Sequence, residues 1–189
     1  DGRCVQVLGS EPFAVALRLE ALEAGATLEG APDAVFDCTS DVTQSFTHAR
    51  ALDEARPRDW ICVTRLGSDP SWVDPEVGMV NGARVGLAKA LHREWPECSA
   101  RMVDVDPTVE DTTAARKLLA ELTSSDGSLE VFHDSGARRS LELQIEDAPP
   151  QGGRIQDGAV IVLTGGTRGV TARVALALAR RGSVRLALL

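Results

Sequence analysis

The stretch that decides the fold is "VIVLTGGTRGVTARVALALARRG", residues 160–182. It opens with an apolar, β-branched run, passes through a glycine-rich turn and continues as a helical pattern that Gly182 ends. A second apolar run follows over 184–189. We predict strands at 159–163 and 184–189 joined by a helix over 170–181, which is the order of a βαβ unit.

The turn in this unit has the composition of a phosphate-binding loop. Its glycines let the backbone turn tightly and bring N–H groups against a pyrophosphate at the helix N-terminus, where the helix dipole favours negative charge. The predicted contacts come from Thr164, Gly165, Gly166, Thr167, Arg168, Gly169 and Val170. The alternative is a tight strand-to-helix turn that holds no ligand.

The residues before this unit have the pattern of a longer α/β domain, in which short apolar runs alternate with helical segments. We predict strands at 5–8, 34–38, 60–64 and 100–107, and helices at 12–24, 42–55, 81–96 and from Thr108 or Glu110 onward. Residues 129–143 alternate around a turn and predict a β-hairpin. The apolar stripe expected for the third helix is Ala83, Leu87, Ala90 and Leu91.

The first strand and helix are joined by "GSEPFA", residues 9–14. A phosphate needs free N–H groups at this position, but Pro12 has none and Glu11 repels anions. The front of the chain therefore has the layout of a nucleotide-binding fold without its chemistry, and we predict a structural role for it.

Composition limits the possible functions. The 189 residues carry a net charge of −8 without a basic stripe, which argues against a nucleic-acid partner. There is no apolar run of the roughly 20 residues that cross a bilayer, and residues 1–8 lack the order of a signal peptide, so we expect a cytoplasmic protein with no membrane partner. The cysteines are far apart and predict buried free thiols rather than disulfides or a metal site: Cys4, Cys38, Cys62 and Cys98.

Other residues with reactive or aromatic side chains favour structural roles. His48, His92 and His133 fall on different predicted elements, which favours isolated histidines over a catalytic or metal cluster. Asp104 and Asp106 alternate at a strand end, where solvated carboxylates are expected. The tryptophans are expected in core or interface packing: Trp60, Trp72 and Trp95.

Three stretches together give the chain a family resemblance: "GLAKALHREWPECSARMVDVDP", "LEVFHDSGARRSLEL" and the opening stretch. They resemble the ketoreductase domain of type I polyketide synthases and of the related polyunsaturated fatty-acid synthases. The resemblance implies a degenerate, cofactor-free Rossmann-like subdomain over 1–148, a linker over 149–158, and the start of a truncated catalytic subdomain of the short-chain dehydrogenase/reductase type over 159–189.

The resemblance implies NADPH as cofactor and a 3-ketoacyl thioester on an acyl carrier protein as substrate, within a multifunctional synthase whose neighbouring domains are further partners. It places Arg168 where a basic side chain favours the 2′-phosphate of NADPH; the alternative is a solvated loop arginine. The family's loop, T-G-x-x-x-G-x-G, ends in glycine where this chain has Thr171, which predicts altered helix packing.

The family's catalytic serine, tyrosine and lysine have no counterpart in this chain, which contains no tyrosine. We therefore assign no catalytic residue and expect the chain alone to be inactive. Two functions remain open: the front part of an active ketoreductase, and a non-catalytic scaffold that organises neighbouring synthase domains.

Overall fold

The computed structural model describes residues 2–67, 74–146 and 155–189. These residues form two compact units, Asp1–Leu143 and Gln144–Leu189, and each is described by itself. Most of the predicted linker over 149–158, and Trp72, lie outside the described residues.

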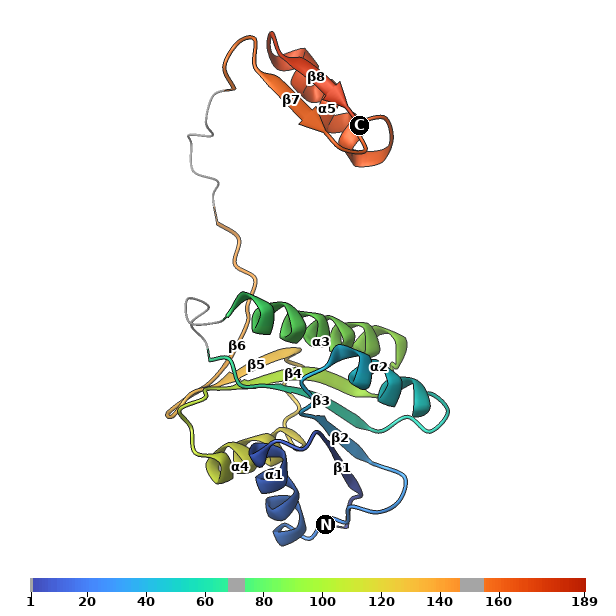
Figure 1. The fold of residues 1–189 in the computed structure, drawn as a ribbon, viewed down its shortest axis with the longest axis vertical. Coiled ribbons are helices and arrows are strands. Elements are labelled where there is room, and N and C mark those ends of the chain that lie inside the picture. The colour runs from blue at the N-terminus through green and yellow to red at the C-terminus, as the bar shows by residue number, and fades with distance from the viewer. Residues whose placement is uncertain (1, 68–73, 147–154) are drawn as a thin grey trace. The chain divides into compact units, whose positions relative to one another are not determined.

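The N-terminal unit is built on one six-stranded sheet whose spatial order follows the sequence, β1 to β6 (Figure 1). Strands β1 to β5 are parallel, and β6 pairs antiparallel with β5. The bounds are Val5–Leu8 (β1), Ala34–Asp37 (β2), Asp59–Thr64 (β3), Ser99–Val105 (β4), Glu130–His133 (β5) and Arg138–Ser140 (β6). This arrangement confirms the predicted α/β class, a parallel sheet with an added hairpin.

Helices cover both faces of this sheet: α2 and α3 lie on one face and α1 and α4 on the other (Figure 1). Their bounds are Pro12–Glu23 (α1), Val42–Ala51 (α2), Pro75–Glu94 (α3) and Asp111–Glu121 (α4). Three of the four begin at a carboxylate that accepts backbone N–H groups of the first turn: Asp41, Asp74 and Glu110. Within the described ranges, no helix is long and apolar enough to cross a membrane.

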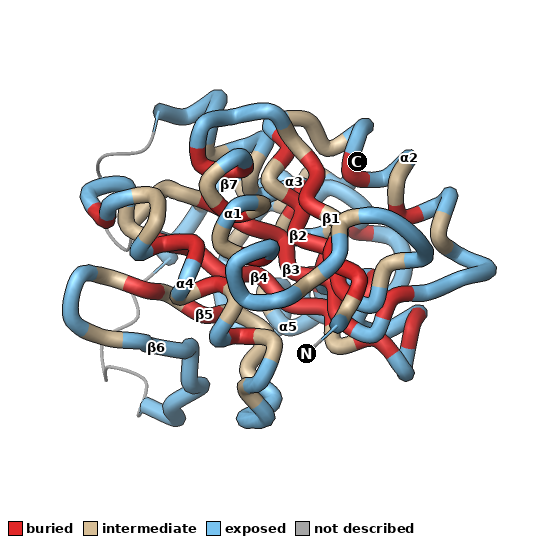
Figure 2. Tube along the Cα trace, turned by 90° about the horizontal axis from the view of Figure 1, so that it is seen from below, coloured by how far each residue is buried: buried red, intermediate tan, exposed pale blue. Residues whose placement is uncertain are grey.

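The core lies on both faces of the central strands, which are buried along their length (Figure 2). This is why β2 and β3 are apolar almost without interruption, as parallel strands covered on both sides must be. On the α2–α3 face, Trp60 and Trp95 pack edge to face with ring centroids 6.1 Å apart, which confirms core packing for these two tryptophans.

Helix α3 differs from its prediction in length and in the face that it buries. It begins at Pro75 rather than near residue 81, because Asp74 caps its first turn and proline is well suited to the first helical position. The predicted stripe is partly confirmed: Leu91 is buried and Leu87 packs beside it, but Ala83 and Ala90 are exposed, and Arg84 and Ala88 are buried instead. Arg84 is buried because its guanidinium donates hydrogen bonds to the backbone carbonyl oxygens at the ends of β2 and β3.

The β5–β6 hairpin is shorter than the predicted 129–143, since β6 ends at Ser140. Its turn is held by the carboxylate of Asp134, which accepts the backbone N–H groups of Gly136 and Ala137. The hairpin is fastened to α4 through the buried Glu121, whose carboxylate lies 2.7 Å from both His133 Nε2 and Arg138 Nε.

The C-terminal unit is a single βαβ element, as predicted. Strands β7 (Val160–Leu163) and β8 (Arg185–Leu188) are parallel neighbours, and helix α5 (Gly169–Arg181) connects them. Along β7, exposed Val160 and Val162 alternate with less exposed residues, so one face of this small sheet is covered and the other is open.

Candidate functional site

The glycine-rich loop lies between β7 and α5, at the carboxyl end of a parallel strand. Two of its glycines have left-handed backbone conformations, with φ of +67° at Gly165 and +63° at Gly169. Residues with a Cβ avoid this region at a cost of roughly 1–2 kcal/mol. A Cβ at either position would meet no atom within 4 Å. These two glycines are therefore required by backbone conformation and not by crowding.

Gly166 is required for the opposite reason. A Cβ there would lie 2.6 Å from Cδ2 of Leu188 and 3.2 Å from the carbonyl oxygen of Leu163. Gly166 is the one buried residue among the seven predicted contacts. The loop thus turns tightly against the ends of both strands and leaves its other residues facing solvent.

The N-terminus of α5 differs from those of α2, α3 and α4. Its N-cap residue is Arg168, in an extended conformation, and no side chain caps the first turn. The unpaired N–H groups and the helix dipole place partial positive charge here, and Arg168 adds a full charge. No carboxylate among the described residues lies within ion-pair distance of Arg168. The geometry fits an anion such as a phosphate, which would accept the N–H groups that a carboxylate accepts in α2, α3 and α4.

The spacing i, i+4, i+7 and i+8 in α5 predicts an apolar stripe of Val170, Val174, Ala177 and Leu178. Of these, Leu178 is on the packed face together with Thr171, Ala172 and Ala175, whereas the other three residues of the predicted stripe are exposed. Thr171, at the family's last glycine, is thus on the packed face of the helix.

The corresponding edge of the N-terminal unit, where β2 and β3 end, is occupied by the protein's own charges. The guanidinium of Arg84 donates to the carbonyl oxygens of Asp37 and Val63, at 2.6 and 3.1 Å, and lies 3.4 Å from the Asp37 carboxylate. Sequence reasoning missed Arg84, because an arginine within an amphipathic helix is normally a solvated one.

Two more side chains close this edge. Arg18 of α1 donates to the carbonyl oxygens of Val7 and Gly9 at the end of β1, both at 2.6 Å. Asp104 accepts the Thr64 hydroxyl at 2.6 Å and a backbone N–H of Gly67 at 2.9 Å. The predicted solvation of Asp104 is therefore wrong: the carboxylate is buried because it ties down the chain that follows β3.

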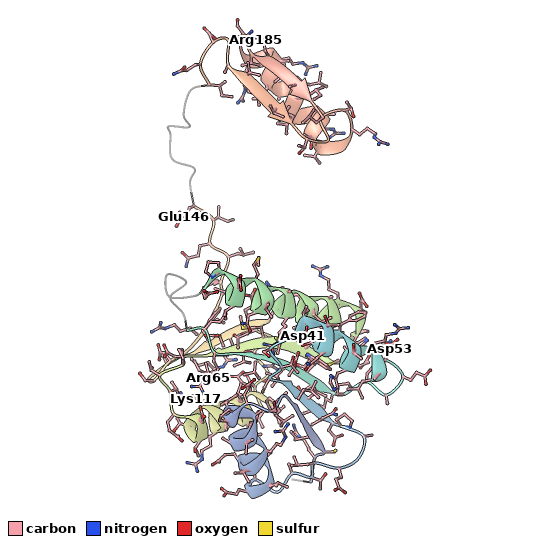
Figure 3. The ribbon with its side chains drawn as sticks, viewed as in Figure 1. Asp41, Asp53, Arg65, Lys117, Glu146 and Arg185 are labelled. Carbon is pink, nitrogen blue, oxygen red and sulfur yellow. The ribbon has the colours of Figure 1, made fainter. Side chains whose placement is uncertain are left out.

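A cavity of about 240 Å³ remains beside these groups, lined in part by Phe13, Cys38, Thr39 and Arg65. It is smaller than the roughly 300–1,000 Å³ of ordinary small-molecule pockets. Figure 3 shows Arg65, which stacks its guanidinium over the Phe13 ring with 4.9 Å to the centroid. The stacked side chains of Arg65 and Phe13 fill part of the space at this end of the sheet.

The remaining chemistry-bearing residues have structural surroundings. All four cysteines are free; three are buried and Cys38 is half-buried. Burial raises the pKa of the Cys62 and Cys98 thiols to about 12, so neither is a nucleophile near neutral pH. His48 is half-buried, His92 is exposed, and His133 is buried against Glu121. Among the residues that the structure describes, no three metal-ligating side chains gather.

No protein-family model matches the sequence, and no curated protein does. Solved structures do match. The first ketoreductase of the tylosin polyketide synthase aligns with all of the chain and 48% of its own, at 19% identity and a TM-score of 0.68. A-type ketoreductases from a modular polyketide synthase align with 99% of the chain and 48% of theirs, at 24% identity and a TM-score of 0.63.

A third match is the ketoreductase from the first module of phoslactomycin biosynthesis in Streptomyces sp. HK803, with 23% identity, a TM-score of 0.63, and 98% of this chain and 44% of that one covered. The chain has the ketoreductase fold. It spans about half the length of these ketoreductases. The matched region includes both the N-terminal unit and the C-terminal unit, which carries the glycine-rich loop.

Proposed function

We propose that the chain is the front part of an NADPH-dependent ketoreductase of a polyketide or fatty-acid synthase. It would comprise the structural subdomain, residues 1–148, and the first βαβ unit of the catalytic subdomain, residues 159–189. The observation that carries the proposal is the loop before α5: it leaves a helix N-terminus uncapped and exposed, inside a chain with the ketoreductase fold from end to end.

In the proposed reaction, NADPH supplies a hydride to the 3-keto carbon of an acyl thioester held on a carrier protein, and the product is the 3-hydroxyacyl thioester. This chain would contribute cofactor binding. The N–H groups at the start of α5 would hold the pyrophosphate, and Arg168 would pair with the 2′-phosphate. The left-handed glycines and Gly166 keep this loop close to the strand ends, where the backbone can approach the ligand.

The proton that neutralises the alkoxide would come from another part of the enzyme. A general acid must lie within hydrogen-bond reach of the carbonyl oxygen, and the family uses a tyrosine for this step, while the chain contains none. The partners proposed for this chain are therefore the rest of the catalytic subdomain, the neighbouring synthase domains and the acyl carrier protein. A cytoplasmic location remains a prediction.

Isothermal titration with NADPH and NADH tests the assignment. The 189-residue chain should bind NADPH weakly and in a salt-sensitive manner, because it supplies the pyrophosphate contacts without those to ribose and nicotinamide. Arg168→Ala should weaken NADPH binding about tenfold, the loss of one charge-assisted contact, and leave NADH binding nearly unchanged. Arg173→Ala, an exposed arginine of α5, is the matched control. Micromolar binding that ignores Arg168→Ala would place the dinucleotide elsewhere.

A non-catalytic scaffold is the second candidate function. It is favoured by the N-terminal unit, in which Arg84, Arg18 and Asp104 occupy the edge where a parallel sheet usually binds its ligand. The two functions predict different sequences for the rest of the complete protein. A Tyr-x-x-x-Lys motif after Leu189 would support the reductase, and its absence from the complete protein would support the scaffold.

A further inference from the structure

Helix α1 is apolar on two opposite faces. Its sequence, "PFAVALRLEALE", holds three charged residues among twelve. The inward face, Phe13, Ala14, Leu17 and Ala21, is buried in the core beside α4. These four residues provide the packing that α1 needs within its own unit, so the apolar residues of the other face do not contribute to this core.

The outward face carries Val15, Leu19 and Leu22, with 48%, 57% and 48% of their surface exposed. Their spacing of i, i+4 and i+7 places them in one stripe along the helix, which we call the α1 stripe. Surface helices normally carry polar residues at these positions, and a contiguous exposed apolar stripe marks an interaction surface.

The exposed charged residues of α1 itself are acidic, whereas its half-buried Glu20 pairs with Arg116 of α4. Glu11 and Glu23 are exposed at the two ends of the α1 stripe, whereas the one cation of the helix, Arg18, donates to the carbonyl oxygens of Val7 and Gly9. The surroundings have the same sign: residues 1–143 hold 25 acidic and 14 basic residues, a net charge of −11. A second copy of this unit would bring like charges together, which costs affinity and association rate.

We infer that the α1 stripe docks a cationic amphipathic helix from another protein domain. The partner's apolar residues would recur at i, i+4 and i+7 and pack on Val15, Leu19 and Leu22. Its lysines or arginines would face Glu11 and Glu23, which are 12 residues apart and so roughly 18 Å apart along the helix axis. This inference does not depend on the proposed reductase function, because the scaffold would use the same surface.

A direct test is binding of the full 189-residue chain to two synthetic helical peptides. Both carry leucines at i, i+4 and i+7; one is flanked by lysines and the other by glutamates. We expect the chain to bind the lysine-flanked peptide more tightly, by fluorescence anisotropy. Leu19→Asn should weaken this binding at least about tenfold, while Met79→Asn, which alters an exposed side chain of α3, should leave it unchanged. Urea midpoints of both variants, equal to wild type, show that the fold is intact.

Charge preference is tested by Glu23→Lys, which should weaken binding of the lysine-flanked peptide and strengthen that of its glutamate-flanked counterpart. Equal binding of both peptides to the wild-type chain, or binding that survives Leu19→Asn, would overturn the inference. Sedimentation tests whether a second copy of this chain occupies the α1 stripe instead. A wild-type dimer that Leu19→Asn dissociates would assign the stripe to a second copy and would also overturn the inference.

Discussion

The guanidinium of Arg84 lies 3.4 Å from the carboxylate of Asp37, and the two side chains are 3% and 1% exposed. Arg84 comes from α3 and Asp37 from the end of β2, and the same guanidinium reaches the carbonyl oxygen of Val63 at the end of β3. One side chain therefore links a helix to two strands. It does so at the edge of the sheet that ligand-binding relatives of this architecture keep open.

Arg84→Met should destabilise the N-terminal unit by about 3 kcal/mol or more, since removing one partner leaves a buried carboxylate without its countercharge. Urea denaturation followed by circular dichroism measures this loss. Arg84→Met combined with Asp37→Asn should cost less than the sum of the single changes, because the pair is coupled. Additive losses would show that Arg84 acts only through the backbone carbonyls.

The glycines of the loop should separate into two classes. At Gly165 and Gly169, where φ is positive and space is open, asparagine should be tolerated better than alanine, because asparagine enters the left-handed region more readily. At Gly166 both substitutions should destabilise the C-terminal unit by about 1–3 kcal/mol, as overpacking does. Hydrogen exchange of the β7 and β8 amides reports the difference. The prediction fails if Gly166→Asn is as mild as Gly165→Asn.

Glu121 should make the N-terminal unit sensitive to acid. Burial alone would raise the pKa of this carboxyl, but the hydrogen bonds from His133 and Arg138 outweigh burial and lower it from 4.5 to about 2. A depressed pKa in the folded state stabilises the protein above the unfolded pKa, and this stabilisation is lost as the pH falls toward the folded value. We expect roughly 3 kcal/mol to disappear between about pH 4.5 and 2.

Unfolding free energies of wild type and Glu121→Gln over this pH range test the assignment. The variant should be less stable at neutral pH and should lose less stability on acidification, so that the two curves converge near pH 2. Glu142→Gln, which changes an exposed carboxylate, should follow the wild-type curve. Parallel curves for wild type and Glu121→Gln would place the acid sensitivity elsewhere.

The 189-residue chain should not oxidise NADPH in the presence of a 3-ketoacyl thioester. Hydride transfer to the carbonyl leaves an alkoxide that needs a positioned proton donor, and the chain has no tyrosine to supply one. Absorbance at the reduced nicotinamide band measures turnover. Turnover by the purified chain that Arg168→Ala reduces would contradict our assignment of catalysis to residues outside it.

The order of elements could be predicted from the sequence because hydrophobic periodicity and end signals agree at most boundaries. Val5–Leu8 is a strand as predicted, and β7 and α5 follow at the positions that the glycine-rich stretch indicates. Such local signals are sufficient where a strand or helix is governed by its own pattern of burial.

Buried charge could not be predicted in the same way. Arg84 and Asp104 have the appearance of surface residues in the sequence, and each is buried because partners from distant elements satisfy it. The packed face of α5 was only partly predicted: Leu178 packs as expected, but Val174 is exposed and Ala175 is buried, since both fit an apolar stripe. For Arg84 and Asp104 the deciding contacts join residues far apart in the chain, which periodicity within one helix does not encode.

The arginine that begins α5 links the stability of the C-terminal unit to the composition of its solution. A cation at the positive end of a helix dipole opposes helix formation, whereas the carboxylates at α2, α3 and α4 favour it. Any anion that binds there relieves the repulsion and stabilises the folded unit by RT ln(1 + [L]/Kd), where [L] is the anion concentration. The melting temperature of this unit should therefore rise with phosphate concentration, and that of the N-terminal unit should not.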